Sequence, residues 1–210
     1  KVIMASHTAD LAVNFGRRVR NLVGSSPYKE IFPNVELQAD SKSASRWGTN
    51  YNGEYFAIGV GGALAGRGAD LFIIDDPHSE QDAKQNRSDV FLPAWEWFQS
   101  GPIQRLMPGG AIIVVMTRWS KLDLTGQIMN QMTKNDEADP WEIVEFPAIL
   151  TDNKGVERAL WPEFWELKEL QQKRSVLDVR YWNAQYLQNP TSEEGALIKR
   201  EWWNIWEEED

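Results

Sequence analysis

The sequence contains no cysteine, which excludes disulfide bonds and thiolate metal sites and fits a reducing compartment. It also lacks any apolar run near the roughly 20 residues that a helix needs to cross a bilayer, so we expect no membrane-spanning segment. Histidine is scarce, with only His7 and His78. The remaining composition, 42% hydrophobic and 25% charged residues, is typical of a globular domain.

Positive charge is in short supply, with 22 lysines and arginines against 31 aspartates and glutamates and a net charge of −9. This balance excludes a protein whose whole surface coats nucleic acid, but it allows a local basic face. Residues 10–23 predict an amphipathic helix that Thr8 can cap, and its polar face carries Arg17, Arg18 and Arg20. These arginines fit either a solvated helix face or a patch that contacts phosphates.

The octet at residues 71–78 reads LFIIDDPH and is the most informative stretch of the chain. Its four apolar residues predict a strand buried on both faces of a parallel sheet. Asp75 and Asp76 follow at the carboxyl end of that strand, where open α/β sheets bind ligands. Such a pair of acids suits a hydrated Mg²⁺ and is typical of a Walker B strand. The alternative is that the two aspartates only form the turn before Pro77.

A glycine-rich run at residues 59–70 precedes this strand and contains five glycines, which indicates unusual turns or close backbone approach. A phosphate-cradling loop would instead lie between a strand and a helix and end in Lys-Ser or Lys-Thr. This run leads into a strand and has no such lysine. The pattern G-x-x-x-x-G-K-[ST] occurs nowhere in the sequence.

The order of apolar runs and helical patterns predicts an α/β fold with a parallel sheet. We expect strands at residues 2–5, 71–74, 111–116 and 141–146, and a hairpin formed by residues 43–49 and 54–60 around an Asn-Gly turn. Further helices are expected at residues 123–133, 162–172 and 177–187. We place a main domain at residues 1–150 and a small, helical, tryptophan-rich subdomain at residues 151–210.

Three groups of motifs then follow one another along the chain. The run GGALAGRGAD at residues 61–70 leads into IIDDP at 73–77, TRWS at 117–120 precedes DLTG at 123–126, and YWNAQYLQNP at 181–190 precedes EG at 194–195 and KREWW at 199–203. In this order and spacing they resemble the large subunits of phage terminases, the motors that package DNA into procapsids. The resemblance spans nearly the whole chain. It implies a P-loop NTPase-like (ASCE-type) ATPase core followed by a helical linker subdomain.

The resemblance also implies roles for individual residues. Asp75 would be the Walker B acid that holds the water shell of Mg²⁺, and Asp76 would orient the attacking water, although relatives in the wider ATPase class mostly use Glu there. Arg67 would be an arginine finger acting in a neighbouring subunit's site. Thr117 and Arg118 would sense the γ-phosphate of ATP. The alternatives are that Arg67 holds the glycine loop through backbone carbonyls, that Thr117 caps a turn, and that Arg118 pairs with Asp75 or Asp76.

The implied function is the ATPase portion of a viral DNA-packaging motor, with ATP and Mg²⁺ as cofactors. The implied partners are double-stranded DNA bound without sequence specificity, a portal protein, a small terminase subunit and further copies in a ring. The implied location is the host cytoplasm at the procapsid portal. The Arg17–Arg20 face is a candidate for the DNA contact.

Two family features are missing, the Walker A loop and the nuclease domain that would follow Asp210. Together with Lys1, which begins the sequence just before an expected strand, this predicts a piece of a longer chain that neither binds ATP tightly nor hydrolyses it alone. The strand of the Walker A unit would lie beside residues 111–116, so its absence predicts unpaired backbone at that edge. Intermolecular pairing, a rearranged sheet or an upstream segment could each supply the partner.

Two other functions fit the same residues. A metal-dependent phosphoesterase could use Asp75, Asp76 and His78, because mixed Asp and His clusters ligate catalytic metals. A non-catalytic docking module could instead use the tryptophan-rich segment after Pro190.

Overall fold

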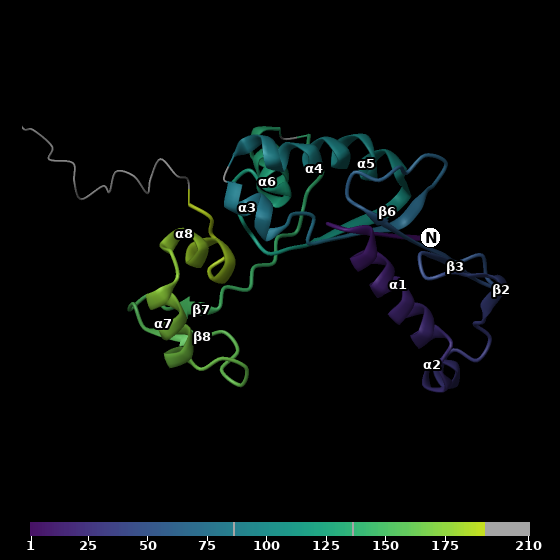
Figure 1. Cartoon of the computed structure of the whole chain (residues 1–210), viewed down its shortest axis with the longest axis horizontal. Coiled ribbons are helices and arrows are strands. Elements are labelled where there is room, and N and C mark those ends of the chain that lie inside the picture. Colours follow the sequence, from purple (N-terminus) through teal and green to yellow (C-terminus); the bar gives the residue numbers. More distant parts are fainter. Residues whose placement is uncertain (86, 136, 192–210) are drawn as a thin grey trace, which may run out of the picture. The chain divides into compact units, whose positions relative to one another are not determined.

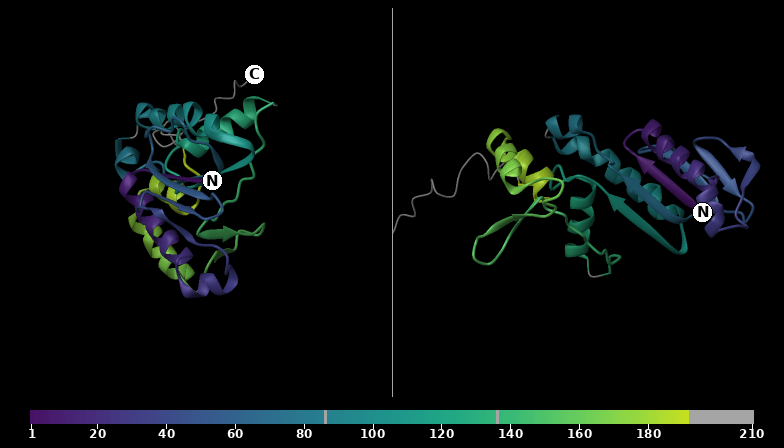
Figure 2. Two further views of the ribbon diagram at one scale, coloured as in Figure 1. Left: turned by 90° about the vertical axis from the view of Figure 1, so that its right-hand side faces the viewer. Right: turned by 90° about the horizontal axis from the view of Figure 1, so that it is seen from below.

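The computed structural model describes residues 1–85, 87–135 and 137–191. The chain divides into two compact units, Lys1–Met116 and Thr117–Asp210, which we describe separately (Figures 1 and 2). The first unit is an α/β layer structure. None of the helices in the described ranges combines the length and the apolar character that a membrane span requires.

The first unit is built on a six-stranded sheet with the strand order β2-β3-β4-β1-β5-β6. Strands β4, β1, β5 and β6 run parallel, whereas β2 and β3 are antiparallel additions at one side. The strands are β1 (Val2–Ser6), β2 (Leu37–Lys42), β3 (Arg46–Thr49), β4 (Glu54–Gly59), β5 (Ala69–Asp75) and β6 (Leu106–Val115). The prediction of a mainly parallel α/β sheet is confirmed.

The hairpin of β3 and β4 forms as the Asn-Gly pair predicts. Asn52 adopts a φ of 59°, the left-handed conformation that such turns require. The N–H of Thr49 donates to the carbonyl of Gly53 at 2.9 Å and closes the turn.

Helix α1 (Ala9–Val23) covers one face of the sheet, opposite the helices α3 to α5 (Figure 1). It begins at Thr8, whose hydroxyl accepts the N–H of Leu11 at 3.3 Å, as the sequence predicts. Gly16 allows close approach, because a Cβ there would lie 2.6 Å from the Tyr55 ring. Around it lies a cluster of buried residues, namely Met4, Ala12, Val23, Trp47, Tyr55 and Ala57.

The opposite face is covered by α3 (Glu80–Gln85), α4 (Ser88–Ser100) and α5 (Pro102–Arg105). Phe72 is fully buried there and meets the Trp97 ring edge-on, with 6.1 Å between centroids. On the α1 side, Leu71 and Ile73 of the same strand are only half-buried. The prediction that this strand is buried on both faces is therefore confirmed only for the face under α3 to α5. The other face is half-buried because α1 packs mainly over β1 and β4.

Strand β6 ends the sheet and leaves one edge open among the described strands. The N–H of Asp76 donates to the carbonyl of Val115 at 2.9 Å, so the backbone polar groups of Val115 point towards β5. Because these groups alternate in direction along a strand, those of Ile112 and Val114 point to the open edge. Ile113 and Val115 are also 46% and 54% exposed. The open edge of the described sheet thus lies along β6, beside the residues where the sequence predicted unpaired backbone.

The second unit contains α6 (Leu124–Lys134), the hairpin of β7 (Ile149–Thr151) and β8 (Glu157–Ala159), and α7 (Leu167–Val176). Helix α8 (Val179–Tyr181) and a π-helical turn, η1 (Trp182–Tyr186), follow. Its core joins Ile149, Ala159, Leu170 and Trp182. The small helical piece was expected only after residue 150, whereas the division falls at residue 116.

The strand predicted at residues 141–146 is wrong, because this segment has no strand partner in the described part of the chain. Three of its four apolar residues are exposed, namely Ile143 at 45%, Val144 at 62% and Phe146 at 69%. The alternation of apolar and acidic residues was correct as a pattern, but a strand also needs a neighbour to accept its hydrogen bonds. Residues 192–210, which carry part of the motif resemblance and three tryptophans, lie outside the described residues.

Truncating Phe72 tests the layering of this sheet. Phe72→Ala should lower the free energy of unfolding by about 3–5 kcal/mol, because the removed ring is fully buried. Leu71→Ala, on the half-buried face of the same strand, should cost about 1–2 kcal/mol. Urea denaturation followed by tryptophan fluorescence measures both. Equal losses would contradict the unequal burial of the two faces.

Candidate functional site

The carboxyl ends of β1 and β5 lie side by side, and parallel pairing sets Ser6 opposite Asp75. Just beyond the strands, the N–H of His7 donates to the carbonyl of Asp76 at 3.1 Å. On the other side of β1, the N–H of Val60 donates to the carbonyl of Ser6 at 2.8 Å. The carboxyl ends of these strands therefore bring together three features: the acidic pair, the turn leading into α1 and the start of the glycine-rich run.

Asp76 turns the chain away from the sheet in a strained conformation. Its φ is 39°, a left-handed value that a non-glycine residue adopts at a cost of about 1 kcal/mol. Two backbone hydrogen bonds hold it there, one to Val115 and one from His7. Strain of this kind, held by the surrounding backbone, is found most often at functional sites.

Asp75 carries a charge that its surroundings disfavour. Partial burial, and then the neighbouring charge of Asp76, raise the pKa of its carboxyl above the usual value. A divalent cation would relieve both effects, and carboxylate oxygens are the ligands that Mg²⁺ prefers. Within residues 1–85, 87–135 and 137–191, no three His, Cys, Asp or Glu side chains are grouped to hold a metal ion, so water and substrate oxygens would complete such a shell.

Ser6 is a site residue that the sequence reasoning did not single out. Its side chain is 0% exposed, and its hydroxyl has no hydrogen-bond partner among the described residues. The available signal was a polar residue ending an apolar strand, one position before His7. Because it stands opposite Asp75 in the sheet, Ser6 adds a further oxygen beside the acidic pair.

His78 is packed into the protein interior. It is 4% exposed, and its ring meets Phe91 of α4 edge-on with 5.1 Å between centroids. This environment is that of a core histidine under a helix, and no metal-holding trio includes it within the described chain. The geometry gives no support to a metal site formed by Asp75, Asp76 and His78.

Arg67 lies at the amino ends of the strands, whereas the acidic pair lies at their carboxyl ends. The glycine-rich run starts after β4 and crosses the sheet to the amino end of β5, with left-handed glycines at Gly61 and Gly66. Arg67 thus stands near the start of β5 and Asp75 at its end, roughly 20 Å apart for a strand of this length. The two residues are not brought together within one chain.

The guanidinium of Arg67 has partners of its own. It lies 3.6 Å from the ring centroid of Phe56 and 3.6 Å from a carboxylate oxygen of Glu54. These contacts differ from the expected alternative, in which backbone carbonyls would hold the guanidinium. Its side chain is 28% exposed, so one part of it faces solvent.

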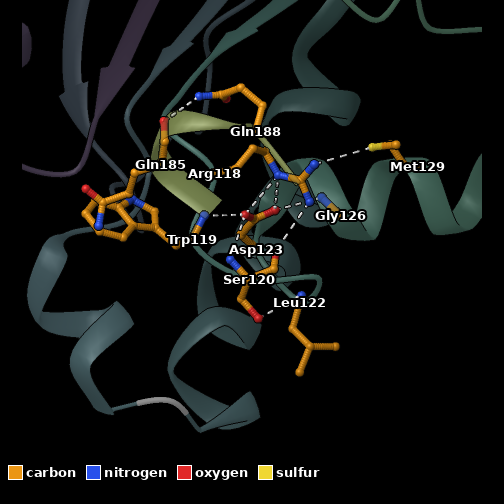
Figure 3. Close-up of polar contacts among 9 residues, drawn as sticks. All are labelled: Arg118, Trp119, Ser120, Leu122, Asp123, Gly126, Met129, Gln185 and Gln188. Carbon is orange, nitrogen blue, oxygen red and sulfur yellow. Dashed lines mark hydrogen bonds and ion pairs between the residues drawn. The ribbon is translucent and has the colours of Figure 1, made fainter. Parts of the chain in front are cut away.

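Thr117 and Arg118 open the second unit, where Arg118 is buried against Asp123 (Figure 3). The Nε of Arg118 lies 3.1 and 3.2 Å from the two carboxylate oxygens of Asp123, which is 0% exposed. The same guanidinium donates to the carbonyl of Ser120 at 3.3 Å and approaches the sulfur of Met129 at 3.7 Å.

Asp123 organises this motif. Its oxygens accept the N–H groups of Trp119, Ser120 and Gly126 at 2.8–3.1 Å, so it caps α6 while pairing with Arg118. The partner of Arg118 is therefore this residue of the same unit, where the sequence interpretation had considered Asp75 or Asp76. A sequence signal existed, since an aspartate directly before an apolar helical run is a typical N-cap.

No protein-family model matches this chain, and no curated protein matches it.

Replacing Asp75 tests the disfavoured charge. Because its pKa is raised, the Asp75 carboxyl holds its proton more tightly in the native protein than in the unfolded chain. Ionising it therefore lowers the free energy of unfolding. This loss is absent below the ordinary pKa of 3.8 and grows as the pH rises from there through the native pKa. Asp75→Asn should therefore raise the free energy of unfolding at about pH 7, and the gain should shrink as the pH falls towards about 4.

Urea denaturation with a chelator present measures this difference. Asp40→Asn, which removes an exposed carboxylate of β2, is the control and should have little effect at any pH. A gain from Asp75→Asn that does not change with pH would contradict the assignment.

The buried pair in the second unit gives a separate test. Asp123→Ala should lower the free energy of unfolding of this unit by about 3–5 kcal/mol, since it leaves the buried charge of Arg118 unpaired. Arg174→Ala breaks a more exposed ion pair, to Glu157, and should cost less than about 1 kcal/mol. Similar losses in both variants, measured by chemical denaturation, would show that Arg118 is not held as described.

Proposed function

We propose that this chain is the ATPase portion of a viral DNA-packaging motor, a terminase large subunit. The observation that carries the proposal is the acidic pair Asp75–Asp76 at the carboxyl end of β5, strained at Asp76 and disfavoured in charge at Asp75. Parallel α/β sheets bind ligands at this edge. The order of the motifs along the chain adds to it.

The residues at this edge fit a Mg²⁺–nucleotide complex. Asp75, with its raised pKa, would hold the water shell of the ion, and when bound the ion would neutralise charge on the phosphates. Asp76 would accept a hydrogen bond from the attacking water and orient it. Asp76 is shorter than the glutamate common in this class, and its left-handed backbone alters the direction in which its carboxylate projects.

The motif at Thr117–Gly126 would relay the state of the nucleotide. Arg118 and Asp123 bind each other and the start of α6, so they tie this turn to the helix. In the proposal, Thr117 senses the γ-phosphate and Arg118 passes its loss on to α6 through Asp123. The buried pair would then serve as the mechanical connection rather than as a phosphate ligand.

Arg67 would act on a neighbouring copy. Its distance from Asp75 excludes action within one chain, whereas its partly exposed position at the other edge allows contact with a second subunit. To reach a phosphate it would have to leave Glu54 and Phe56. This step is part of the proposal.

The phosphate-cradling loop has no counterpart among these residues. The proposal therefore requires that the loop come from elsewhere, either from another part of the same gene product or from another chain. Double-stranded DNA, a portal protein, a small terminase subunit and a ring of copies at the procapsid are proposed as partners on the same basis.

ATP hydrolysis by the product of the complete gene tests the proposal. In the presence of DNA and Mg²⁺, Asp75→Asn and Asp76→Asn should each lower kcat by about 100-fold or more. Asp40→Asn should leave kcat unchanged. Since Asp75→Asn is expected to stabilise the fold, its loss of activity would not reflect unfolding. Hydrolysis that survives both site substitutions would overturn the proposal.

A further inference from the structure

The carboxyl ends of β4, β1 and β5 place a row of three residues on the face of the sheet that α1 covers in part. Parallel pairing sets Ser6 of β1 between Gly59 of β4 and Asp75 of β5. Met4, two positions before Ser6, belongs to the buried cluster that includes residues of α1, and alternation along the strand puts Ser6 on the same face. A Cβ at Gly59 would lie 2.9 Å from the backbone nitrogen of Ala9, so the start of α1 covers the Gly59 end of the row.

The other end of the row is open. Val115 of β6 stands opposite Asp75 and is 54% exposed, whereas Ser6 is 0% exposed. Asp75 lies between them and is partly buried. A ligand can therefore approach Asp75 from the side of β6, with the Ser6 side chain enclosed on the far side of the carboxylate.

The hydroxyl of Ser6 is buried without a hydrogen-bond partner among the described residues. A buried hydroxyl that forms no hydrogen bond lowers stability, and native proteins keep few such groups, often at functional sites. The side chain beside it on β5 is a carboxylate, which accepts hydrogen bonds readily. The orphaned donor of Ser6 thus lies next to an acceptor that takes part in the candidate site.

Only side-chain rotation is needed to join the two groups. The backbone around the row is held by hydrogen bonds from Val60 to Ser6 at 2.8 Å and from His7 to Asp76 at 3.1 Å. Neighbouring strands lie about 4.8 Å apart, which is close enough for a serine and an aspartate on one face to form a hydrogen bond of about 2.7 Å. The fold therefore presents Ser6 to Asp75 without any change in the sheet.

We infer that Ser6 is a positioning residue for a divalent cation bound by Asp75. Its hydroxyl donates a hydrogen bond to one carboxylate oxygen of Asp75 and leaves the other oxygen directed towards the open side. Carboxylates that bind metal ions are commonly oriented by a hydrogen bond of this kind. The cation rests on the proposed function, whereas the role of Ser6 rests on the strand register and on its unpaired hydroxyl.

The test measures binding of Mn²⁺, as a substitute for Mg²⁺, to the full chain without nucleotide. Bound Mn²⁺ loses the sharp EPR signal of the free ion, so the readout does not depend on ATP hydrolysis. Ser6→Ala should weaken Mn²⁺ binding by about 10- to 100-fold, the usual loss when the hydrogen bond that orients a metal ligand is removed. Asp75→Asn should abolish the binding, and Mg²⁺ should displace Mn²⁺ from the unaltered protein.

Urea denaturation of the same variant in metal-free buffer separates this role from a structural one. Ser6→Ala should shift the urea midpoint upward, because it removes a buried hydroxyl that has no partner in the described part of the protein. A serine needed for the fold itself would shift the midpoint downward. The inference therefore predicts opposite signs for stability and for cation affinity.

Two further variants serve as controls. Ser6→Thr restores the hydroxyl on a residue that strands favour, and it should recover most of the Mn²⁺ affinity. Ser175→Ala removes an exposed hydroxyl of α7, which donates to the carbonyl of Gln172 at 2.7 Å, and it should leave the affinity unchanged.

Three results would overturn the inference. These are an unchanged Mn²⁺ affinity in Ser6→Ala, a lowered urea midpoint in that variant, or a folded Ser6→Thr protein that binds Mn²⁺ no better than Ser6→Ala. If Asp75→Asn abolishes binding and Ser6→Ala does not weaken it, the role of Ser6 is rejected and the proposed function stands. If Ser6→Ala weakens binding but the product of the complete gene hydrolyses no ATP, the ATPase assignment is rejected and the role of Ser6 stands. A protein that binds no Mn²⁺ would reject both the cation and the inference.

Discussion

The parallel pairing of β1 with β5 is the constraint on which the rest of the first unit depends. It aligns Ser6 with Asp75, and it brings the turn into α1 next to the acidic pair. The register is held by residues buried on both strands, such as Ile3, Phe72 and Ile74. A slip of one residue in the register would exchange the buried and half-buried faces of both strands. The packing of the core therefore also fixes the position of Ser6 relative to Asp75.

Sheet polarity then decides which charged residues can act together. Parallel strands place all their carboxyl ends at one edge, and a connection between them must cross the sheet to return. The glycine-rich run makes this crossing without a helix, which is why Arg67 ends beside Glu54 and Phe56 at the amino edge. An arginine only eight positions before Asp75 in sequence is thereby separated from it by the length of a strand.

The two charged motifs of the chain are built on opposite principles. Partial burial and the neighbouring carboxylate of Asp76 disfavour the charge of Asp75, which makes this pair suited to an external cation. Arg118 and Asp123 compensate each other and contact five further donors and acceptors. The Asp75–Asp76 pair leaves an unfavourable charge that a bound cation can neutralise, whereas the Arg118–Asp123 pair is neutralised within the protein and ties the turn to α6.

Three elements follow from local signals in the chain: the strand before Asp75, the capped helix after Thr8 and the Asn-Gly hairpin. Period, caps and turn residues act over a few positions, so the chain carries this information without its partners. It also placed Asp75 and Asp76 at a strand end. Four other features depend on the folded arrangement: Arg67 lies at the amino ends of the strands, His78 is a core residue, Asp123 holds Arg118 and residues 141–146 form no strand. Each of these depends on which distant segment lies alongside, and hydrogen-bond partners and burial are properties of that neighbour as much as of the residue itself.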